Sequence, residues 1–266
     1  MKISLYTPLK NPVKRSNRGK VLCVIPARGG SKSIPLKNLV PVLGKPLLHY
    51  ALSSVLKAKS LDRVVVSSEN NLILNFAEKY GEHLSLRRPE RLALDETPSL
   101  DVLLHAMQVC EEEDNATYHI IILVQATNPL VIPQDIDNTV QKLLTSDCDS
   151  CFTVTKVEHI YPAKLKRIEG DHLLTYCEDE REMIRRQDLP DVYIRNGACY
   201  GVRRSTLITG SLFGKDSRAV VVPRERSIDI NSHIDLLIAE ALLKARIKRN
   251  MRPRILIKQK QKIKNG

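Results

Sequence analysis

The stretch VLCVIPARGGSKSIPLKN, residues 21–38, joins a short apolar run to a loop that is rich in glycine and positive charge. Residues 21–25 are apolar without interruption, which predicts a strand buried on both faces, as in a parallel sheet. Pro26 ends that run, and the adjacent Gly29 and Gly30 let backbone N–H groups turn toward an anion. The stretch therefore predicts a buried first strand that opens into an anion-binding loop.

The same loop supplies side chains that suit a triphosphate. Arg28, Lys32 and Lys37 place three cations within ten residues, and Ser31 and Asn38 add neutral donors. An arginine can hold two phosphate oxygens at once, while backbone N–H groups hold others. The loop matches neither the Walker A pattern nor the GxGxxG dinucleotide pattern. A solvated basic turn is the alternative that the local sequence leaves open.

Helix-like and strand-like segments alternate from this loop onward. Strands are predicted at 63–66, 120–124 and 151–157, and helices at 47–58, 71–80, 98–113 and 133–144. This alternation predicts a Rossmann-like α/β fold, with a mostly parallel sheet flanked by helices and right-handed crossovers. Ligands bind beyond the carboxyl ends of the strands in such sheets, so the loops after Ile25, Val66 and Val124 are the candidate site loops.

The pattern changes between residues 158 and 192, where charge density rises and helical periodicity fades. Gly170 and Asp171 predict a hairpin turn between strands at 165–168 and 173–176. We therefore expect an insertion that projects from the sheet.

Regular structure is expected to return after the insertion. Residues 193–202 and 219–222 have the pattern of strands, and Asn231 or Ser232 can cap a last helix. That helix is expected to end near Arg246, with a frayed tail beyond it.

The net charge of +12 lies in the two ends of the 266-residue chain. Residues 1–20 hold six Lys or Arg and no acid, and residues 244–266 hold ten and no acid. The rest carries 26 basic and 30 acidic residues, a net charge of −4. We expect one domain at 20–246, between a flexible basic arm at 1–19 and a basic tail at 247–266. Charge carried by tails says little about what a fold does.

The composition excludes several classes of protein. No apolar run approaches the ~20 residues that cross a bilayer, and the N-terminal segment has no apolar core of a secretory signal. Six scattered cysteines do not resemble a disulfide framework, and the Cys148-to-Cys151 CxxC has no second pair, so we expect idle thiols. A reduced, cytoplasmic setting is expected, or a nuclear one if the source is eukaryotic.

Five segments, in order, resemble the acylneuraminate cytidylyltransferases, which make CMP-activated sialic acids and related nonulosonic acids. The similarity spans about residues 20–245, and Ser33 stands where the family usually has glycine. The matching segments are ARGGSKSIPLKN at 27–38, RPERLALDETPSLD at 88–101, QATNPL at 125–130, RQDLP with NGACY at 186–200, and PRERSIDIN at 223–231.

The resemblance implies that CMP passes from CTP to the anomeric hydroxyl of a nonulosonic acid, with release of pyrophosphate and dependence on Mg²⁺ or Mn²⁺. Such transfers depend mainly on positioning and charge neutralisation, which agrees with a cationic loop. The implied catalytic residues are Arg28, Lys37 and Asp229. The implied nucleotide-binding residues are Ala27, Arg28, Gly29, Gly30, Ser31, Lys32, Lys37, Asn38, Arg88, Thr97 and Ser99.

The resemblance also implies a sugar site, a metal site and a homodimer. The implied sugar-binding residues are Gln125, Lys164, Arg186, Asn196, Tyr200 and Phe213. Asp229 and Asn231 would hold the metal; the family commonly has a carboxylate at the second position, and Asp235 is a possible substitute. The insertion would be a dimerisation arm that lends Lys164 and Arg186 to the partner's sugar carboxylate.

Each of these residues also has a structural interpretation. Arg88 taken alone resembles a surface arginine, Gln125 a strand-end cap, Phe213 a core aromatic, and Asp229 an acid that stabilises a helix N-terminus. Two further functions stay open. One is transfer to the eight-carbon acid Kdo by a related nucleotidyltransferase. The other is nucleic-acid binding through the basic tails, against which the 4% aromatic content argues.

Overall fold

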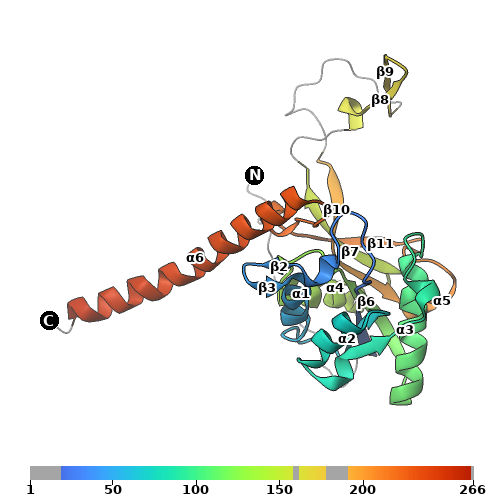
Figure 1. Ribbon diagram of the computed structural model, residues 1–266, viewed down its shortest axis with the longest axis horizontal. Coiled ribbons are helices and arrows are strands. Elements are labelled where there is room, and N and C mark those ends of the chain that lie inside the picture. Colours follow the sequence, from blue (N-terminus) through green and yellow to red (C-terminus); the bar gives the residue numbers. More distant parts are fainter. Residues whose placement is uncertain (1–18, 158–161, 178–190, 265–266) are drawn as a thin grey trace.

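The computed structural model describes residues 19–157, 162–177 and 191–264. The predicted arm at 1–19, except for Gly19, therefore lies outside the described residues, as does Arg186. A seven-stranded sheet forms the centre of the molecule, in the order β11-β7-β10-β6-β1-β4-β5 (Figure 1). Its strands are β1 Lys20–Pro26, β4 Arg63–Ser68, β5 Ser85–Arg87, β6 Tyr118–Val124, β7 Ser150–Lys156, β10 Tyr193–Arg203 and β11 Ser217–Val221.

The strands are buried on both faces because helices cover both sides of the sheet. Val21, Cys23 and Ile25 of β1 join one apolar cluster with α1, α2 and α4, whereas Leu22 and Val24 join a second cluster with α3 and α5. The uninterrupted apolar run of β1 is therefore explained by its central place, and the α/β prediction is confirmed. The helices are α1 Leu47–Val55, α2 Asn71–Glu78, α3 Ser99–Asp114, α4 Pro133–Thr145, α5 Arg204–Ile208 and α6 His233–Lys264.

One strand runs against the others, and it shapes the site. β10 is antiparallel to both β6 and β7, whereas β1 pairs in parallel with β4 and β6. Cys199 of β10 lies opposite Val124, the last residue of β6. The N-terminal half of β10 therefore extends beyond the carboxyl end of β6, over the crevice where a ligand is expected.

The C-terminal helix is longer than predicted. It was expected to end near Arg246, but α6 continues to Lys264 and leaves the body as a long rod (Figure 1). Residues 234–252 contain neither glycine nor proline and are rich in strong helix formers, so nothing local ends the helix where the apolar periodicity fades. The predicted cap at its start is confirmed. Ser232 accepts the Asp235 N–H at 3.4 Å, while Asp235 Oδ2 accepts the Ser232 N–H at 2.8 Å.

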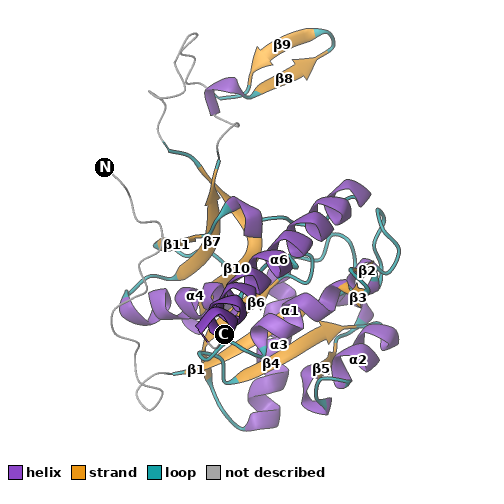
Figure 2. Ribbon diagram, turned by 90° about the vertical axis from the view of Figure 1, so that its left-hand side faces the viewer, coloured by secondary structure: helices purple, strands orange, loops and turns teal. Residues whose placement is uncertain are grey.

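The predicted hairpin is present in the insertion. β8 Lys166–Glu169 and β9 His172–Thr175 pair in antiparallel register around Gly170, whose φ of 65° suits the turn. In Figures 1 and 2 the hairpin stands clear of the central sheet. Ile168 and Leu173 are exposed on it at 72% and 68%.

No residue range was predicted for three short features. These are helix α5, the edge strand β5, and a two-stranded ribbon formed by β2 Pro41–Val42 and β3 Lys45–Pro46.

In the part of the chain that the structure describes, no helix combines the length and apolar character needed to span a membrane. The Cys148 and Cys151 thiols are both buried, and burial raises the pKa of Cys151 to about 12, as expected of an idle thiol.

Candidate active site

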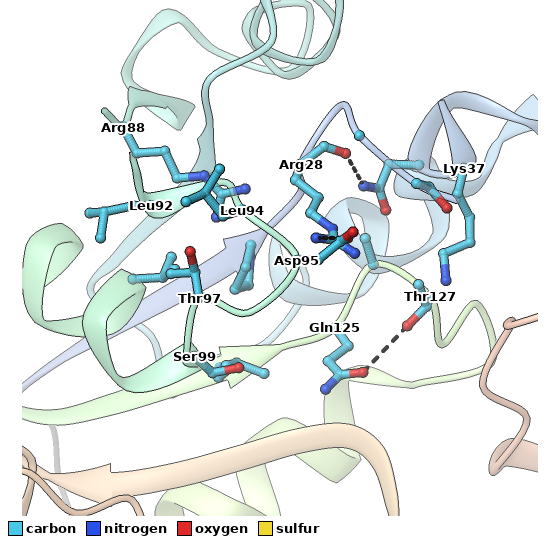
Figure 3. Close-up of a pocket in the computed structure, with 17 residues that line it drawn as sticks. Arg28, Lys37, Arg88, Leu92, Leu94, Asp95, Thr97, Ser99, Gln125 and Thr127 are labelled. Atoms are coloured by element: carbon cyan, nitrogen blue, oxygen red, sulfur yellow. Dashed lines mark hydrogen bonds and ion pairs between the residues drawn. The ribbon is translucent and has the colours of Figure 1, made fainter. Parts of the chain in front are cut away.

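A cavity of about 220 Å³ lies beyond the carboxyl ends of β1 and β6, where the fold predicts a ligand (Figure 3). Eight of the eleven residues predicted to bind the nucleotide line it, and Gln125 and Asp95 lie on its wall as well. These eight come from two separate segments of the sequence, 27–38 and 88–101: Arg28, Gly30, Ser31, Lys37, Asn38, Arg88, Thr97 and Ser99.

The glycine-rich loop is held in shape by its own residues. Asn38 is buried, and its Nδ2 donates to the Arg28 carbonyl at 2.9 Å, which ties the two ends of the loop together. Lys37 begins the 3₁₀ turn η2 Lys37–Leu39, and its Nζ donates to the Ile230 carbonyl at 2.9 Å. Arg28 and Lys37 thus enter the cavity from the ends of one braced loop, as Figure 3 shows.

Ala27 and Gly29 lie behind the cavity rather than on its wall. The Ala27 N–H donates to the Ser67 carbonyl at 3.0 Å, and the Gly29 N–H donates to Glu69 Oε1 at 2.6 Å. A Cβ on Gly29 would come within 2.4 Å of the Asn70 side chain, so only glycine fits here. Both residues therefore dock the loop onto the end of β4.

Glu69 is a site residue that the sequence analysis missed. Glu69 directly follows β4. An acidic residue at the carboxyl end of a second parallel strand is the sequence feature that could have identified it. Its Oε2 accepts from Arg88 Nη2 at 3.1 Å and from Nε at 3.3 Å. Arg88 is only 4% exposed, so its interpretation as a surface arginine is wrong. Burial lowers the pKa of Arg88, while Glu69 opposes that shift.

Asp95 pairs with two of the loop cations. It lies 2.5 Å from Arg28 Nη1 and 2.8 Å from Lys32 Nζ, and the Lys32 hydrogen bond is the main cause that lowers the pKa of Asp95. Lys32 does not line the cavity, and its side chain is 87% exposed. A bound triphosphate would compete with Asp95 for both cations.

A second cavity, of about 310 Å³, adjoins the first and shares Gln125 with it. Gln125, Asn196 and Tyr200, three of the predicted sugar-binding residues, line it together with Thr155, Ile194, Arg195, Gly197, Ser227 and Asp229. Lys164 lies in the 3₁₀ turn η5 Pro162–Lys164 of the insertion and is not on this wall.

Asn196 is held by the protein itself. Its Oδ1 accepts from Thr153 Oγ1 at 2.7 Å and from the Ala198 N–H at 3.2 Å, and its Nδ2 donates to Ser227 Oγ at 3.1 Å. The amide therefore fixes the irregular middle of β10, where Gly197 has a φ of 75°. One Nδ2 hydrogen has no partner among the described residues.

Phe213 lies beside the second cavity but does not line it. Its ring stacks on Phe152 with centroids 5.0 Å apart, and Phe152 also meets the Tyr200 ring edge to face at 5.1 Å. Phe213 is 42% exposed, so its interpretation as a core aromatic is wrong.

Asp229 carries the feature that points to a bound cation. Its Oδ2 accepts from Asn231 Nδ2 at 3.0 Å, but its Oδ1 is buried and has no hydrogen-bond partner among the described residues. A buried, unsatisfied carboxylate oxygen is costly unless a ligand meets it. Mg²⁺ prefers such oxygens and can take its other ligands from phosphates and water. Asp229 and the neutral Asn231 amide thus fit a nucleotide-bound cation.

The remaining acid considered for the metal has another role. Asp235 Oδ2 accepts from the Asn231 N–H, the Ser232 N–H and the Ser232 hydroxyl, at 2.8 to 3.0 Å, so it caps α6. The described residues contain no cluster of three or more His, Cys, Asp or Glu that could hold a metal. Substrate oxygens would therefore have to complete the coordination.

The fold and the site together define a nucleotide-binding enzyme whose loop chemistry suits phosphoryl transfer. The family model described as Cytidylyltransferase matches residues 22–221, so this chain belongs to the cytidylyltransferase family and is a nucleotidyltransferase.

Named relatives agree with this assignment. The chain is 33% identical over 227 residues to a pseudaminic acid cytidylyltransferase of Campylobacter jejuni, which covers 85% of this chain and 97% of that protein. It is 29% identical to an N-acylneuraminate cytidylyltransferase of Escherichia coli over 84% of this chain and 52% of that protein. The structure of CMP:2-keto-3-deoxy-manno-octonic acid synthetase complexed with CTP has the same fold, with a TM-score of 0.66 and 17% identity over 85% of this chain and 99% of that one.

Proposed function

We propose that this enzyme transfers CMP from CTP to the anomeric hydroxyl of a nonulosonic acid and releases pyrophosphate. The observation that carries the proposal is the contact between two cavities at Gln125: one is lined by a cationic glycine loop, the other by amide, hydroxyl and aromatic groups. The names of the similar pseudaminic acid and N-acylneuraminate cytidylyltransferases support a nine-carbon acid as the acceptor.

The proposed reaction forms a bond between the anomeric oxygen and the α-phosphorus and breaks the bond to the β-phosphate oxygen. The hydroxyl proton leaves to solvent, and pyrophosphate departs with its negative charge. Arg28 and Lys37 neutralise the charge that builds on the triphosphate, and Arg88, fixed by Glu69, closes the far wall of the nucleotide cavity. Gln125 can donate and accept hydrogen bonds at once, which suits a hydroxyl-rich acceptor.

We further propose that Mg²⁺ is required, held by Asp229 with help from Asn231. When bound, the ion would neutralise phosphate charge and favour ionisation of the attacking hydroxyl. The buried Asp229 oxygen without a partner supports this proposal.

We also propose a homodimer formed through the insertion at 158–192. The exposed apolar residues Ile168 and Leu173 on the β8–β9 hairpin support a partner surface there. Light scattering after size-exclusion chromatography should give about twice the 30.1 kDa chain mass. A 30 kDa particle at assay concentration would contradict the dimer.

A pyrophosphate-release screen tests the main proposal. CTP, UTP, GTP and ATP are each offered with pseudaminic, legionaminic and N-acetylneuraminic acids and with Kdo, in the presence of Mg²⁺. Release with CTP and one of the nine-carbon acids is expected. Release with Kdo alone would favour the eight-carbon acceptor instead, and no release with any acid would refute the proposal.

A further inference from the structure

Arg195 is a charged group of the second cavity that neither the sequence motifs nor the assigned reaction uses. It lies on the part of β10 that extends past Val124 and lines the cavity beside Asn196. No ion pair joins Arg195 to a carboxylate in the described parts of the chain, and no hydrogen bond of its guanidinium is found there. It is thus a cation at a ligand cavity with no counter-ion among the residues that the structure describes.

Aromatic rings hold this cation in place. The Arg195 guanidinium carbon lies 4.8 Å from the centre of the Phe213 ring and 5.8 Å from that of Phe152. Stacking of this kind uses the face of the planar guanidinium and leaves the N–H groups at its edge free. The two rings are themselves stacked, so they form a fixed platform.

The charged side chains that line the second cavity indicate what Arg195 can bind. Asp229 is the one carboxylate on its wall and Arg195 the one cationic side chain, counting only the lining residues that the structure describes. Asp229 without its proposed Mg²⁺ would repel an acidic acceptor, and with the ion in place the positive charge would be taken up by the phosphates of CTP. A nonulosonic acid carries its carboxylate on the carbon that bears the attacking hydroxyl, so this group must enter the same cavity. Bringing it there requires a compensating cation.

We propose that Arg195 binds the carboxylate of the acceptor, from within the same subunit. This inference rests on the proposed function and deepens it. It differs from the expectation that Lys164 and Arg186 of a partner arm supply that charge, because Arg195 lines the cavity of its own chain. The planar Arg195 edge can hold both carboxylate oxygens at once.

The test compares Arg195→Met with the wild-type enzyme on the active nonulosonic acid and on its methyl ester. Loss of a bidentate charged contact should lower kcat/KM for the acid by about 10- to 100-fold. The ester has no carboxylate charge, so the variant and the wild type should use it equally well. The KM for CTP should stay unchanged, and Arg195→Lys should recover part of the activity with the acid.

Two controls separate this role from a structural one. Arg218→Met removes an arginine that is 53% exposed on β11, and it should behave as wild type on acid and ester. Lys164→Met and Arg186→Met test the partner-arm alternative in the same assay.

Different outcomes would overturn the role of Arg195 and the proposed CMP-transfer function. Equal losses on acid and ester for Arg195→Met would overturn the inference, as would selective losses found only for Lys164→Met or Arg186→Met. Inactivity of the wild type with every acid would overturn the proposed function, and this inference with it.

Discussion

The two cavities of this enzyme are built in different ways. In the nucleotide cavity, each of the three cationic side chains on the described wall already has a protein partner: Arg88 has Glu69, Arg28 has Asp95, and Lys37 has the Ile230 carbonyl. In the acceptor cavity, the Arg195 edge and Asp229 Oδ1 have no partner among the described residues. The cations of the first cavity are positioned by protein partners before a ligand arrives, whereas the second cavity contains charged groups whose partners are not among the described residues.

This difference follows from the sheet. The nucleotide cavity lies over parallel strands, whose carboxyl ends deliver contiguous loops to one edge. The acceptor cavity lies where antiparallel β10 interrupts that order, so its wall combines the end of β6 with the middle of β10 and the segment before α6. Substitutions should therefore affect the binding of CTP and of the acceptor separately, according to the cavity they touch, except at Gln125, which lines both.

The largest effect is expected at Lys37. Lys37→Met removes a half-buried cation from the triphosphate cavity, and kcat/KM for CTP should fall about 10³-fold. Lys45→Met is the matched control, since Lys45 is exposed on the neighbouring β3 and lines neither cavity. It should stay within about twofold of wild type. Equal losses for both variants in pyrophosphate release would contradict the assigned role.

The next effect is expected at Asp229, which lines the acceptor cavity and lies close enough to Lys37 to oppose the lowering of the Lys37 pKa by burial. Asp229→Asn keeps the shape but removes the charge, so kcat should fall about 10²-fold and half-maximal activity should need more Mg²⁺. Asn231→Asp adds a carboxylate and should lower the Mg²⁺ requirement. Mg²⁺ titrations of both variants check this, and an unchanged requirement in Asp229→Asn would remove Asp229 from the metal site.

A smaller effect is expected at Gln125, the residue that both cavities share. Gln125→Met removes the amide but keeps the side-chain length, so the KM of the acceptor should rise about tenfold while CTP binding changes little. CTP affinity is measured by calorimetry without acceptor. A larger loss for CTP than for the acceptor would move Gln125 into the nucleotide site and weaken the division proposed here.

The smallest effect is a shift in pH dependence. Burial lowers the pKa of Lys37 from its ordinary value of 10.5, although Asp229 opposes this. The protonated lysine binds the triphosphate, so kcat/KM for CTP should fall as pH rises through that lowered pKa. Lys37→Arg keeps its charge at higher pH, and the alkaline fall should move upward. An identical alkaline limb in variant and wild type would assign it to another group.

The sequence alone determined the central strands of this protein and the location of its nucleotide-binding loop. The apolar runs of 21–25 and 120–124 predicted two strands, the first of them buried on both faces, and β1 and β6 lie at the centre of the sheet with helices on either side. The loop at 27–38 was identifiable because its glycines and cations are contiguous. Contiguous residues that follow a parallel strand have only one edge of the sheet to occupy, so five of the predicted nucleotide residues in this loop line one cavity.

Only the tertiary structure decided the roles of the residues that act across long separations. Glu69 and Arg88 meet because β4 and β5 are neighbours, and Arg195 stacks on Phe213 although eighteen positions separate them. α6 likewise passes the predicted end at Arg246, where the sequence offers no stop signal. A linear pattern reports which side chains are present and which local structure they favour. Their partners, and the charges left without one, depend on strand order and on burial, which arise only when the chain folds.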